Sequence, residues 1–276
     1  MPRIAIGDCH LYYERHGGGF PVLLITGLGG FGGFWREQLP AFGRSFEVVT
    51  HDHRGIGQSD HTRGGYTVER MARDVLGLMD ALGIARAHIV GHSTGGAIAQ
   101  ILAIENPERL GAVVISASWT KSDPYFRRMF ALRKDILHRM GPEAYLQSAT
   151  LFLYPPWWVS CNNERLRQQE AQNLAAMSAP EIIAQRIDAI VAFDRTAQLG
   201  RIRTPTLVVG AVDDIVTPSY FSEELARRIP GAELKLFPKG GHCFTQVLAR
   251  DFNNAVLPFL AAHTPNEESP PVARRA

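Results

Sequence analysis

The chain alternates short, continuous apolar runs with longer segments in which apolar residues recur every three or four positions. The continuous runs predict buried strands at residues 21–26, 46–50, 87–90, 111–116, 206–210 and 233–237. The recurring pattern predicts amphipathic helices, for example over residues 68–82, and a short helix over residues 35–42. Strands that alternate with helices form a mostly parallel sheet with helices on both faces, preceded here by a β-hairpin at residues 3–14. The pattern therefore predicts an α/β fold.

The alternation stops in the middle of the chain. Between residues 119 and 199 the pattern is helical, with segments at 126–140, 164–177 and 180–193 and no clear strand. We therefore expect a helical cap at 119–199 inserted into a core formed by 1–118 and 200–262. Residues 263–276, rich in Pro, Glu and Arg, predict a disordered tail.

A Gly-x-Ser-x-Gly motif joins one predicted strand to the following helix. It consists of Gly91, Ser93 and Gly95, between the apolar run 87–90 and the helical segment 97–104. Glycines on both sides permit a sharp turn that holds the serine in a strained, exposed conformation, as a nucleophile requires. The alternative is a serine that merely caps the helix after a glycine turn.

A serine hydroxyl is a poor nucleophile unless a base takes its proton and an acid orients that base. When such a triad is built on an α/β sheet, its members follow in the order serine, acid, histidine, each beyond the end of a strand. Here Asp213 and Asp214 follow strand 206–210, and His242 follows strand 233–237. We predict Ser93 as nucleophile, His242 as base and Asp213 as acid. We expect Asp214 to be a solvated neighbour or a helix cap.

Three further positions, His92, Thr94 and Leu28, are interpreted from strand direction and turn geometry. His92 should face away from Ser93 and pack in the interior, because successive strand residues alternate in direction. Backbone amides for an oxyanion hole are expected from Thr94 and from Leu28, in the glycine-rich turn at 27–30. That turn could alternatively hold a phosphate, but it lacks both a following Lys-Ser/Thr and a Gly-x-Gly-x-x-Gly pattern.

Composition excludes several classes of protein. The 276 residues are 45% hydrophobic and 20% charged, with a net charge of +2 and no basic stripe, which argues against nucleic-acid binding. No apolar run is long enough to span a membrane. The three separated cysteines, Cys9, Cys161 and Cys243, suit reduced thiols in the cytoplasm. We expect a cytoplasmic protein whose partner is a small-molecule substrate, with no metal or cofactor; a homodimer is compatible with the sequence.

Taken together, these motifs resemble those of the capped α/β-hydrolases. The resemblance covers nearly the whole chain, and its segments are 26–30, 52–59, 91–96, Asp213 and 241–242. It implies the α/β-hydrolase fold and a serine nucleophile, and it implies a structural role for Arg54. The chain departs from the pattern at Thr26, where many members carry histidine, which changes the polarity at the edge of the site.

Within this superfamily the chain looks most like small-molecule hydrolases of bacterial catabolism. These are the aminoacrylate/carbamate hydrolases of the Rut pyrimidine-degradation pathway and the 3-oxoadipate enol-lactonases. The closer likeness, to the Rut enzymes, lies in cap segments 118–119, 126–130 and 151–155. It implies a small, polar or anionic substrate with a labile C–N or C–O acyl bond.

Several cap residues are candidates for contacting the substrate, because a lid over an active site must exclude water. They are Trp119, Arg127, Phe130, Trp157 and Trp158. The aromatic rings could instead pack the cap onto the core. Arg127 could bind a substrate carboxylate if it turned inward, and the alternative is that Arg127 and Arg128 are solvated.

The sequence thus predicts a cofactor-independent serine hydrolase acting on an ester, lactone, amide or carbamate through an acyl-enzyme on Ser93. A carbon–carbon bond hydrolase or a perhydrolase would use the same triad. A ligand sensor with this fold and little turnover is the alternative from another class. An epoxide hydrolase or dehalogenase would need an aspartate where Ser93 stands.

Overall fold

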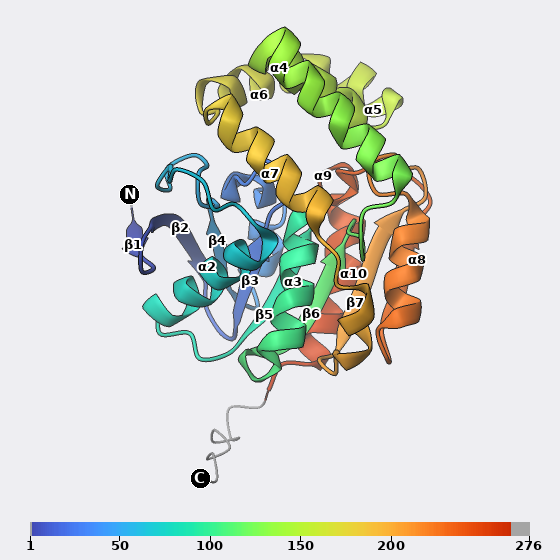
Figure 1. Cartoon of the computed structure of the whole chain (residues 1–276). Coiled ribbons are helices and arrows are strands. Elements are labelled where there is room, and N and C mark those ends of the chain that lie inside the picture. The colour runs from blue at the N-terminus through green and yellow to red at the C-terminus, as the bar shows by residue number, and fades with distance from the viewer. Residues whose placement is uncertain (1, 266–276) are drawn as a thin grey trace.

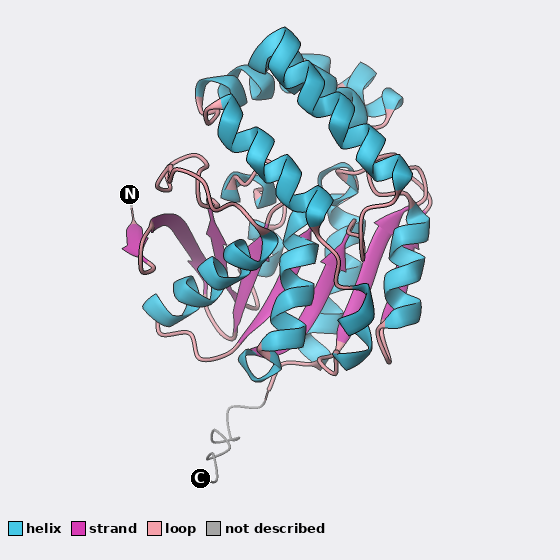
Figure 2. Cartoon of the chain, in the orientation of Figure 1, coloured by secondary structure: helices cyan, strands magenta, loops and turns pink. Residues whose placement is uncertain are grey.

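A computed structural model of the chain describes residues 2–265, and its centre is an eight-stranded sheet (Figures 1 and 2). The strand order is β1-β2-β4-β3-β5-β6-β7-β8; β1 and β2 form antiparallel pairs, and the other pairs are parallel. The strands are β1 Arg3–Ala5, β2 His10–Gly17, β3 Pro21–Ile25, β4 Glu47–His51, β5 Ala87–His92, β6 Leu110–Ser116, β7 Thr206–Ala211 and β8 Glu233–Phe237. The predicted hairpin and the mostly parallel sheet are confirmed.

Helices cover both faces of the sheet. One face carries α2 (Val68–Ala81), α3 (Thr94–Glu105) and α8 (Ser219–Arg228), whose apolar residues join one core cluster. The opposite face carries η1 (Gly32–Trp35), α1 (Leu39–Phe42), α9 (Phe244–Val247) and α10 (Ala249–Ala262). Where the sequence predicted a helix over 35–42, the chain forms η1 and the four-residue α1. The short turn η2 (Pro107–Arg109) precedes β6.

Helix α2 shows how the sequence specifies these elements. Thr67 begins the helix by accepting a hydrogen bond from the backbone N–H of Arg70 at 3.0 Å. Its apolar residues recur at helical spacing and are buried against the sheet, while the opposite side meets solvent. By contrast, α3 is buried from Thr94 through Ile104, which explains its continuous apolar sequence.

Close packing of α3 on the sheet depends on glycine. A Cβ on Gly95 would lie 2.1 Å from the carbonyl oxygen of Ile25, at the end of β3. The helix can therefore approach the strand closely enough for Ser93, just before it, to meet the turn that follows β3.

Four helices and a 3₁₀ segment lie between β6 and β7, in the segment for which a cap was predicted. They are α4 Pro124–Leu153, α5 Pro156–Cys161, α6 Asn163–Ala175, α7 Pro180–Ala192 and η3 Thr196–Arg201. Helix α4 is bent at Gly141, whose φ is 87°, immediately before Pro142. Helices α4 to α7, which we call the cap, lie across the end of the sheet at which the parallel strands finish (Figure 1).

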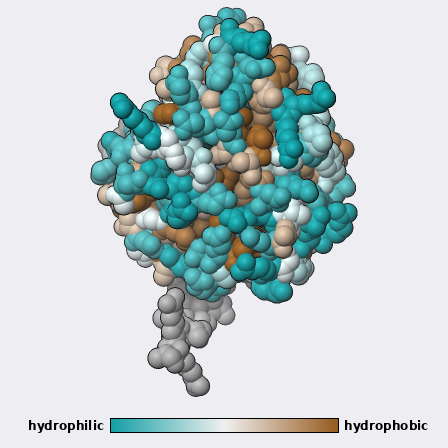
Figure 3. Space-filling model, in the orientation of Figure 1, coloured by the Kyte–Doolittle hydropathy of each residue, from teal (hydrophilic) through white to brown (hydrophobic). Residues whose placement is uncertain are grey.

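Polar residues cover most of the face seen in Figure 3, and apolar residues reach the surface near its centre, where the cap meets the core. In the described part of the chain, no helix combines the length and apolar character needed to cross a bilayer. Cys9, Cys161 and Cys243 form no disulfide with one another. Most of the predicted tail, residues 266–276, lies outside the described residues.

Candidate active site

Ser93 occupies a strained turn between β5 and α3. Its φ and ψ are 54° and −113°, and apart from Ala117 no other non-glycine residue among residues 2–265 has a positive φ. The turn closes only because Gly91 lacks a side chain: a Cβ there would lie 2.1 Å from the carbonyl oxygen of Gly95. Strain of this kind persists where the surrounding structure enforces it, as at the nucleophile of an α/β sheet. The predicted strained turn is present, but Ser93 is buried, at 6% exposed, and not exposed as expected.

His242 is held by a buried carboxylate. Its Nδ1 lies 2.8 Å from Oδ2 of Asp214, and both residues are at most 3% exposed. Asp214 also accepts hydrogen bonds from the backbone N–H of Val216 at 2.7 Å and of Thr217 at 3.0 Å, and from the Thr217 hydroxyl at 2.8 Å. With four donors around it, the carboxylate is fixed in orientation. Because Asp214 accepts the hydrogen bond at Nδ1, Nε2 is the ring nitrogen left to act as the base.

The prediction that Asp213 holds His242 is wrong. Asp213 is exposed, and its carboxylate accepts hydrogen bonds from the backbone N–H groups of Gly240 at 3.1 Å and Gly241 at 2.8 Å. It thus secures the loop that carries His242 without touching the imidazole. Asp214, expected to be solvated or a cap, is the buried partner, because the turn formed with Val216 and Thr217 directs its side chain inward.

The turn after β3 lies directly over the serine. A Cβ on Gly27 would lie 3.0 Å from Cβ and 3.5 Å from Oγ of Ser93. Thr94 is the first residue of α3, where an amide has no partner within the helix. Among residues 2–265, the amides of Leu28 and Thr94 donate to no backbone carbonyl. Neither amide therefore has a backbone acceptor among these residues, and their role in binding an oxyanion stays a prediction.

His92 packs in the interior beside this site. Its ring stacks on Phe34, with centroids 4.9 Å apart, and its Nδ1 lies 3.1 Å from Oγ of Ser116. Burial lowers the pKa of His92 well below its usual value, so the ring stays neutral next to His242, whose centroid is 4.9 Å away. This agrees with the expectation that His92 packs and is not a second base.

The cap candidates have different environments. Trp119 and Phe130 are buried, and each packs against Phe126, at centroid distances of 4.7 and 4.4 Å. Trp158 is partly buried and packs on a small cluster that includes Cys243. For these three residues a role in substrate binding stays a prediction.

Arg127 and Trp157, both candidates for contacting the substrate, are not turned inward; for Arg127 this is the solvated alternative. Arg127 is exposed, and its Nε donates to Oγ of Ser122 at 3.1 Å. Trp157 is 43% exposed, and the ammonium of Lys239 lies 5.3 Å from the centroid of its ring. These contacts with Ser122 and Lys239 hold both side chains at the surface.

Two residues of the site were missed by sequence reasoning. Thr217 orients Asp214 and also lies 3.3 Å from Nδ1 of His242 through its hydroxyl. Spacing offered a signal for it, since an aspartate often binds backbone and hydroxyl groups two and three residues later. Arg186 of α7 binds the carbonyl oxygen of Leu28, and nothing in its local sequence predicts that contact.

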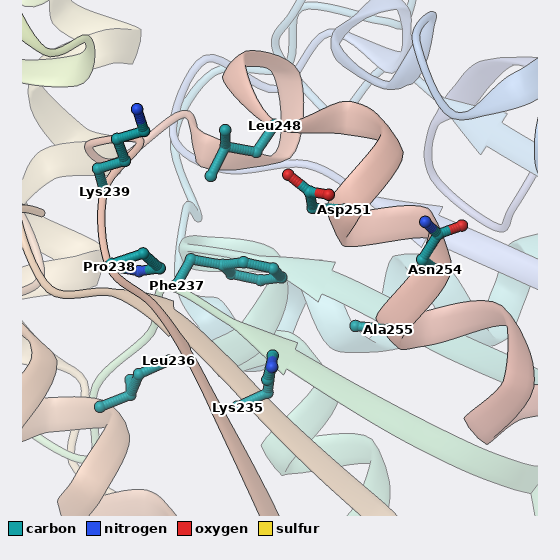
Figure 4. Close-up of a pocket in the computed structure, with 9 residues that line it drawn as sticks. All are labelled: Lys235, Leu236, Phe237, Pro238, Lys239, Leu248, Asp251, Asn254 and Ala255. Carbon is teal, nitrogen blue, oxygen red and sulfur yellow. The ribbon is translucent and has the colours of Figure 1, made fainter.

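A separate pocket of about 410 Å³ opens between β8 and α10 (Figure 4). It is lined by Lys235, Leu236, Phe237, Pro238, Lys239, Leu248, Asp251, Asn254 and Ala255. None of these residues belongs to the site around Ser93. Within residues 2–265, no cluster of three or more His, Cys, Asp or Glu residues could hold a metal ion.

The fold and this geometry define a class of protein. Residues 21–245 match the family described as alpha/beta hydrolase fold, and the chain belongs to that family. The fold predicted from the sequence and the resemblance to capped members of the family are confirmed.

Individual members of this family are similar to the chain over almost their whole length. The chain is 42% identical over 259 residues to a protein of Azorhizobium caulinodans named "Putative carbamate hydrolase RutD", with 94% of this chain and 98% of the relative covered. A protein of the same name from Caulobacter vibrioides is 42% identical over 266 residues, covering 94% and 99%. Among solved structures, the enol-lactonase from Burkholderia xenovorans LB400 has a TM-score of 0.87 at 26% identity, covering 94% of this chain and all of that one.

Proposed function

We propose that this protein is a cofactor-independent serine hydrolase that cleaves carbamate, ester, lactone or amide bonds through an acyl-enzyme on Ser93. The observation that carries the proposal is the 2.8 Å contact between Asp214 and His242, combined with the strained turn that presents Ser93. Ser93, Asp214 and His242 follow in the chain order of this family's triads, each beyond the end of a strand.

Acylation begins when Nε2 of His242 takes the proton from Ser93 Oγ as that oxygen bonds to the acyl carbon. The carbonyl electron pair moves onto oxygen, and the amides of Leu28 and Thr94 bind the resulting oxyanion. Asp214 stabilises the imidazolium and keeps the ring in the productive orientation. Collapse of the intermediate breaks the bond to the leaving oxygen or nitrogen, which receives the proton from His242.

Deacylation repeats these steps with water. His242 takes a proton from the water as its oxygen bonds to the acyl carbon, and the same two amides bind the second oxyanion. The Ser93–acyl bond then breaks, and Ser93 Oγ recovers its proton from His242. The residues present therefore complete a catalytic cycle with water as the only co-reactant.

A carbamate or a related small acyl compound is the substrate that we favour. Support comes from the relatives named carbamate hydrolases, which are aligned over almost their whole length, and from the likeness to an enol-lactonase. The triad determines the type of reaction, while residues of the cap select the substrate. We therefore propose a small polar or anionic metabolite of catabolism as the substrate class.

Hydrolysis of p-nitrophenyl acetate by the wild type and by Ser93→Ala tests the mechanism when product is followed beyond one equivalent. We expect sustained release from the wild type and none above background from the variant. Small carbamates, lactones and amides would then be compared by kcat/KM. Release that is unchanged in Ser93→Ala would contradict the assignment of the nucleophile, and a burst limited to one equivalent would favour a ligand sensor.

A further inference from the structure

The cap contacts the turn after β3, residues 27–30, through one fully buried guanidinium. Arg186, in the middle of α7, is 0% exposed. Its Nε and Nη2 both donate to the carbonyl oxygen of Leu28, at 3.2 and 3.1 Å. Its Nη1 donates to the carbonyl oxygen of Arg54 at 3.3 Å, and Nη2 lies 3.0 Å from Nδ1 of His53. A single cap side chain thus joins the turn after β3 to the loop after β4.

This guanidinium has no acidic partner: no carboxylate in residues 2–265 forms an ion pair with it. Burial lowers the pKa of Arg186 to about 10, which leaves the side chain protonated at neutral pH. An isolated buried charge is unfavourable unless hydrogen bonds satisfy it, and here only neutral groups do so. Burial and the nearby positive charge also lower the pKa of His53 well below its usual value, so its Nδ1 can remain an acceptor.

The turn is shaped to admit the guanidinium. Gly30, the last residue of the turn, has a φ of 74°. A Cβ at this position would lie 3.1 Å from Nη2 of Arg186 and 2.7 Å from Cγ1 of Ile56. The glycine therefore leaves the space in which α7 can deliver its side chain to Leu28.

We propose that Arg186 is a positioning residue for the oxyanion hole, so that the cap itself completes the catalytic site. Two N–H donors on the Leu28 carbonyl fix the peptide that joins Leu28 to Gly29, and so restrict the adjoining peptide that carries the Leu28 N–H. The positive charge is fully buried behind the same turn, where it favours negative charge developing on the substrate oxygen. This inference rests on the proposed function, because it assigns Arg186 a part in stabilising the same oxyanion.

A merely structural arginine would support cap packing without a specific effect on the transition state. The two roles differ in what they change. Displacement of a preorganised donor lowers kcat and the affinity for a transition-state analogue, whereas loss of packing lowers the free energy of unfolding. A phenylboronic acid is a suitable analogue, because its boron bonds to a catalytic serine and becomes tetrahedral and negatively charged.

The test compares Arg186→Gln, Arg186→Lys and a matched control, Asp188→Asn. Asp188 lies two residues further along α7 and pairs at 2.7 Å with Lys134 of α4, so its loss perturbs the cap away from the turn. For each purified full-length variant we would measure kcat and KM for p-nitrophenyl acetate, the inhibition constant of phenylboronic acid, and thermal unfolding.

We expect Arg186→Gln to lower kcat about 10²-fold and to weaken boronate inhibition by a similar factor, with KM changed less than about threefold. Arg186→Lys should recover part of the loss, because the ammonium retains the charge and can still donate to the Leu28 carbonyl. Asp188→Asn should resemble the wild type. Wild-type kcat and boronate inhibition in a folded Arg186→Gln would overturn the inference. The inference would also be overturned if Arg186→Gln and Arg186→Lys lost kcat equally, in proportion to their lowered melting temperatures, while boronate inhibition stayed at the wild-type level.

The same experiment separates this inference from the proposed function. If the wild type and Asp188→Asn turn over in a Ser93-dependent manner, and Arg186→Gln does so with wild-type kcat and boronate inhibition, only the role of Arg186 is refuted. If the wild type shows no Ser93-dependent turnover, both fall, because there is then no oxyanion for the turn to bind.

Discussion

Asp214 Oδ2 lies 2.8 Å from Nδ1 of His242, while the adjacent Asp213 binds the backbone of the two glycines before that histidine. Two neighbouring carboxylates thus act on the same loop in different ways. One orients the imidazole, and the other fixes the backbone that carries it.

This division of labour predicts unequal effects of two matched substitutions. Asp214→Asn should lower kcat by about 10⁴-fold, because an amide can present a donor to Nδ1 and favours the wrong tautomer. Asp213→Asn should lower it by less than about tenfold, since the amide oxygen can still accept from Gly240 or Gly241. Steady-state kinetics at neutral pH would decide between them. A larger loss in Asp213→Asn would contradict the assignment of Asp214 as the acid.

Buried histidines predict loss of stability in acid. Burial, with a smaller effect of the nearby Arg186 charge, lowers the pKa of His51 to about 4, below the usual value of 6.5. Between these two values the unfolded chain binds more protons than the folded one, so the free energy of unfolding falls as pH decreases from 6.5 to 4. A lowering of the pKa from 6.5 to about 4 corresponds to about 3 kcal/mol from this residue.

Urea unfolding at pH 7.5 and pH 5 would measure this effect. His51→Phe keeps an aromatic ring that can stack on His53, which now lies at a centroid distance of 5.1 Å, but it removes the titrating group. The variant should therefore lose less stability on acidification than the wild type does. An identical pH dependence in the two proteins would exclude His51 as a source of the acid lability.

A buried ion pair outside the site predicts a change in stability without a change in chemistry. Arg54 binds Asp74 of α2 through two hydrogen bonds of 2.9 and 2.7 Å, and both side chains are at most 6% exposed. Asp74→Asn leaves the guanidinium with its exposed partner Asp8 alone, and should lower the free energy of unfolding by about 3 kcal/mol.

The matched control is Asp8→Asn, which removes the exposed partner of the same arginine and should cost less than about 1 kcal/mol. Denaturant unfolding gives both values, and kcat of the folded fraction should be unchanged in each variant. Comparable destabilisation by the two substitutions would show that burial does not determine the strength of these contacts.

Close packing of α3 on β3 predicts intolerance to a single methyl group. Gly95→Ala would place Cβ 2.1 Å from the carbonyl oxygen of Ile25, so the backbone must shift. This shift should lower the free energy of unfolding by about 1–3 kcal/mol or more, the usual cost of overpacking. Gly33→Ala is the control, because no atom lies within 4 Å of the added Cβ. Thermal unfolding of both variants would test this, and a Gly95→Ala protein as stable as Gly33→Ala would refute it.

Local sequence was sufficient for the features that depend on neighbouring residues. The turn at Ser93 was predictable because its glycines, the preceding apolar strand and the following helix lie within a few residues of one another. The strained φ of Ser93 confirms that geometry. The turn containing Leu28 was predictable in the same way, from an apolar run that ends in glycines.

Features that depend on distant packing were not predictable. Asp213 and Asp214 have the same side chain at adjacent positions, and the hydrogen bonds from Val216 and Thr217 determine which one turns toward His242. In the sequence, Arg186 is one polar residue on an amphipathic helix; its burial depends on how α7 lies against segments more than a hundred residues away. Arg127, for which the local sequence left both an inward and a solvated position open, is exposed.

The bridge from Arg186 to Leu28 has a thermodynamic consequence. If seating the cap strengthens oxyanion binding, then by reciprocity an oxyanion in the site must hold the cap more firmly on the core, by the same free energy. In each turnover the cap would therefore be held more firmly on the core while either tetrahedral intermediate is present. It would be held less firmly once the negative charge on the substrate oxygen is lost. The cap would be held most tightly while the reaction is in progress and least tightly when product is ready to leave.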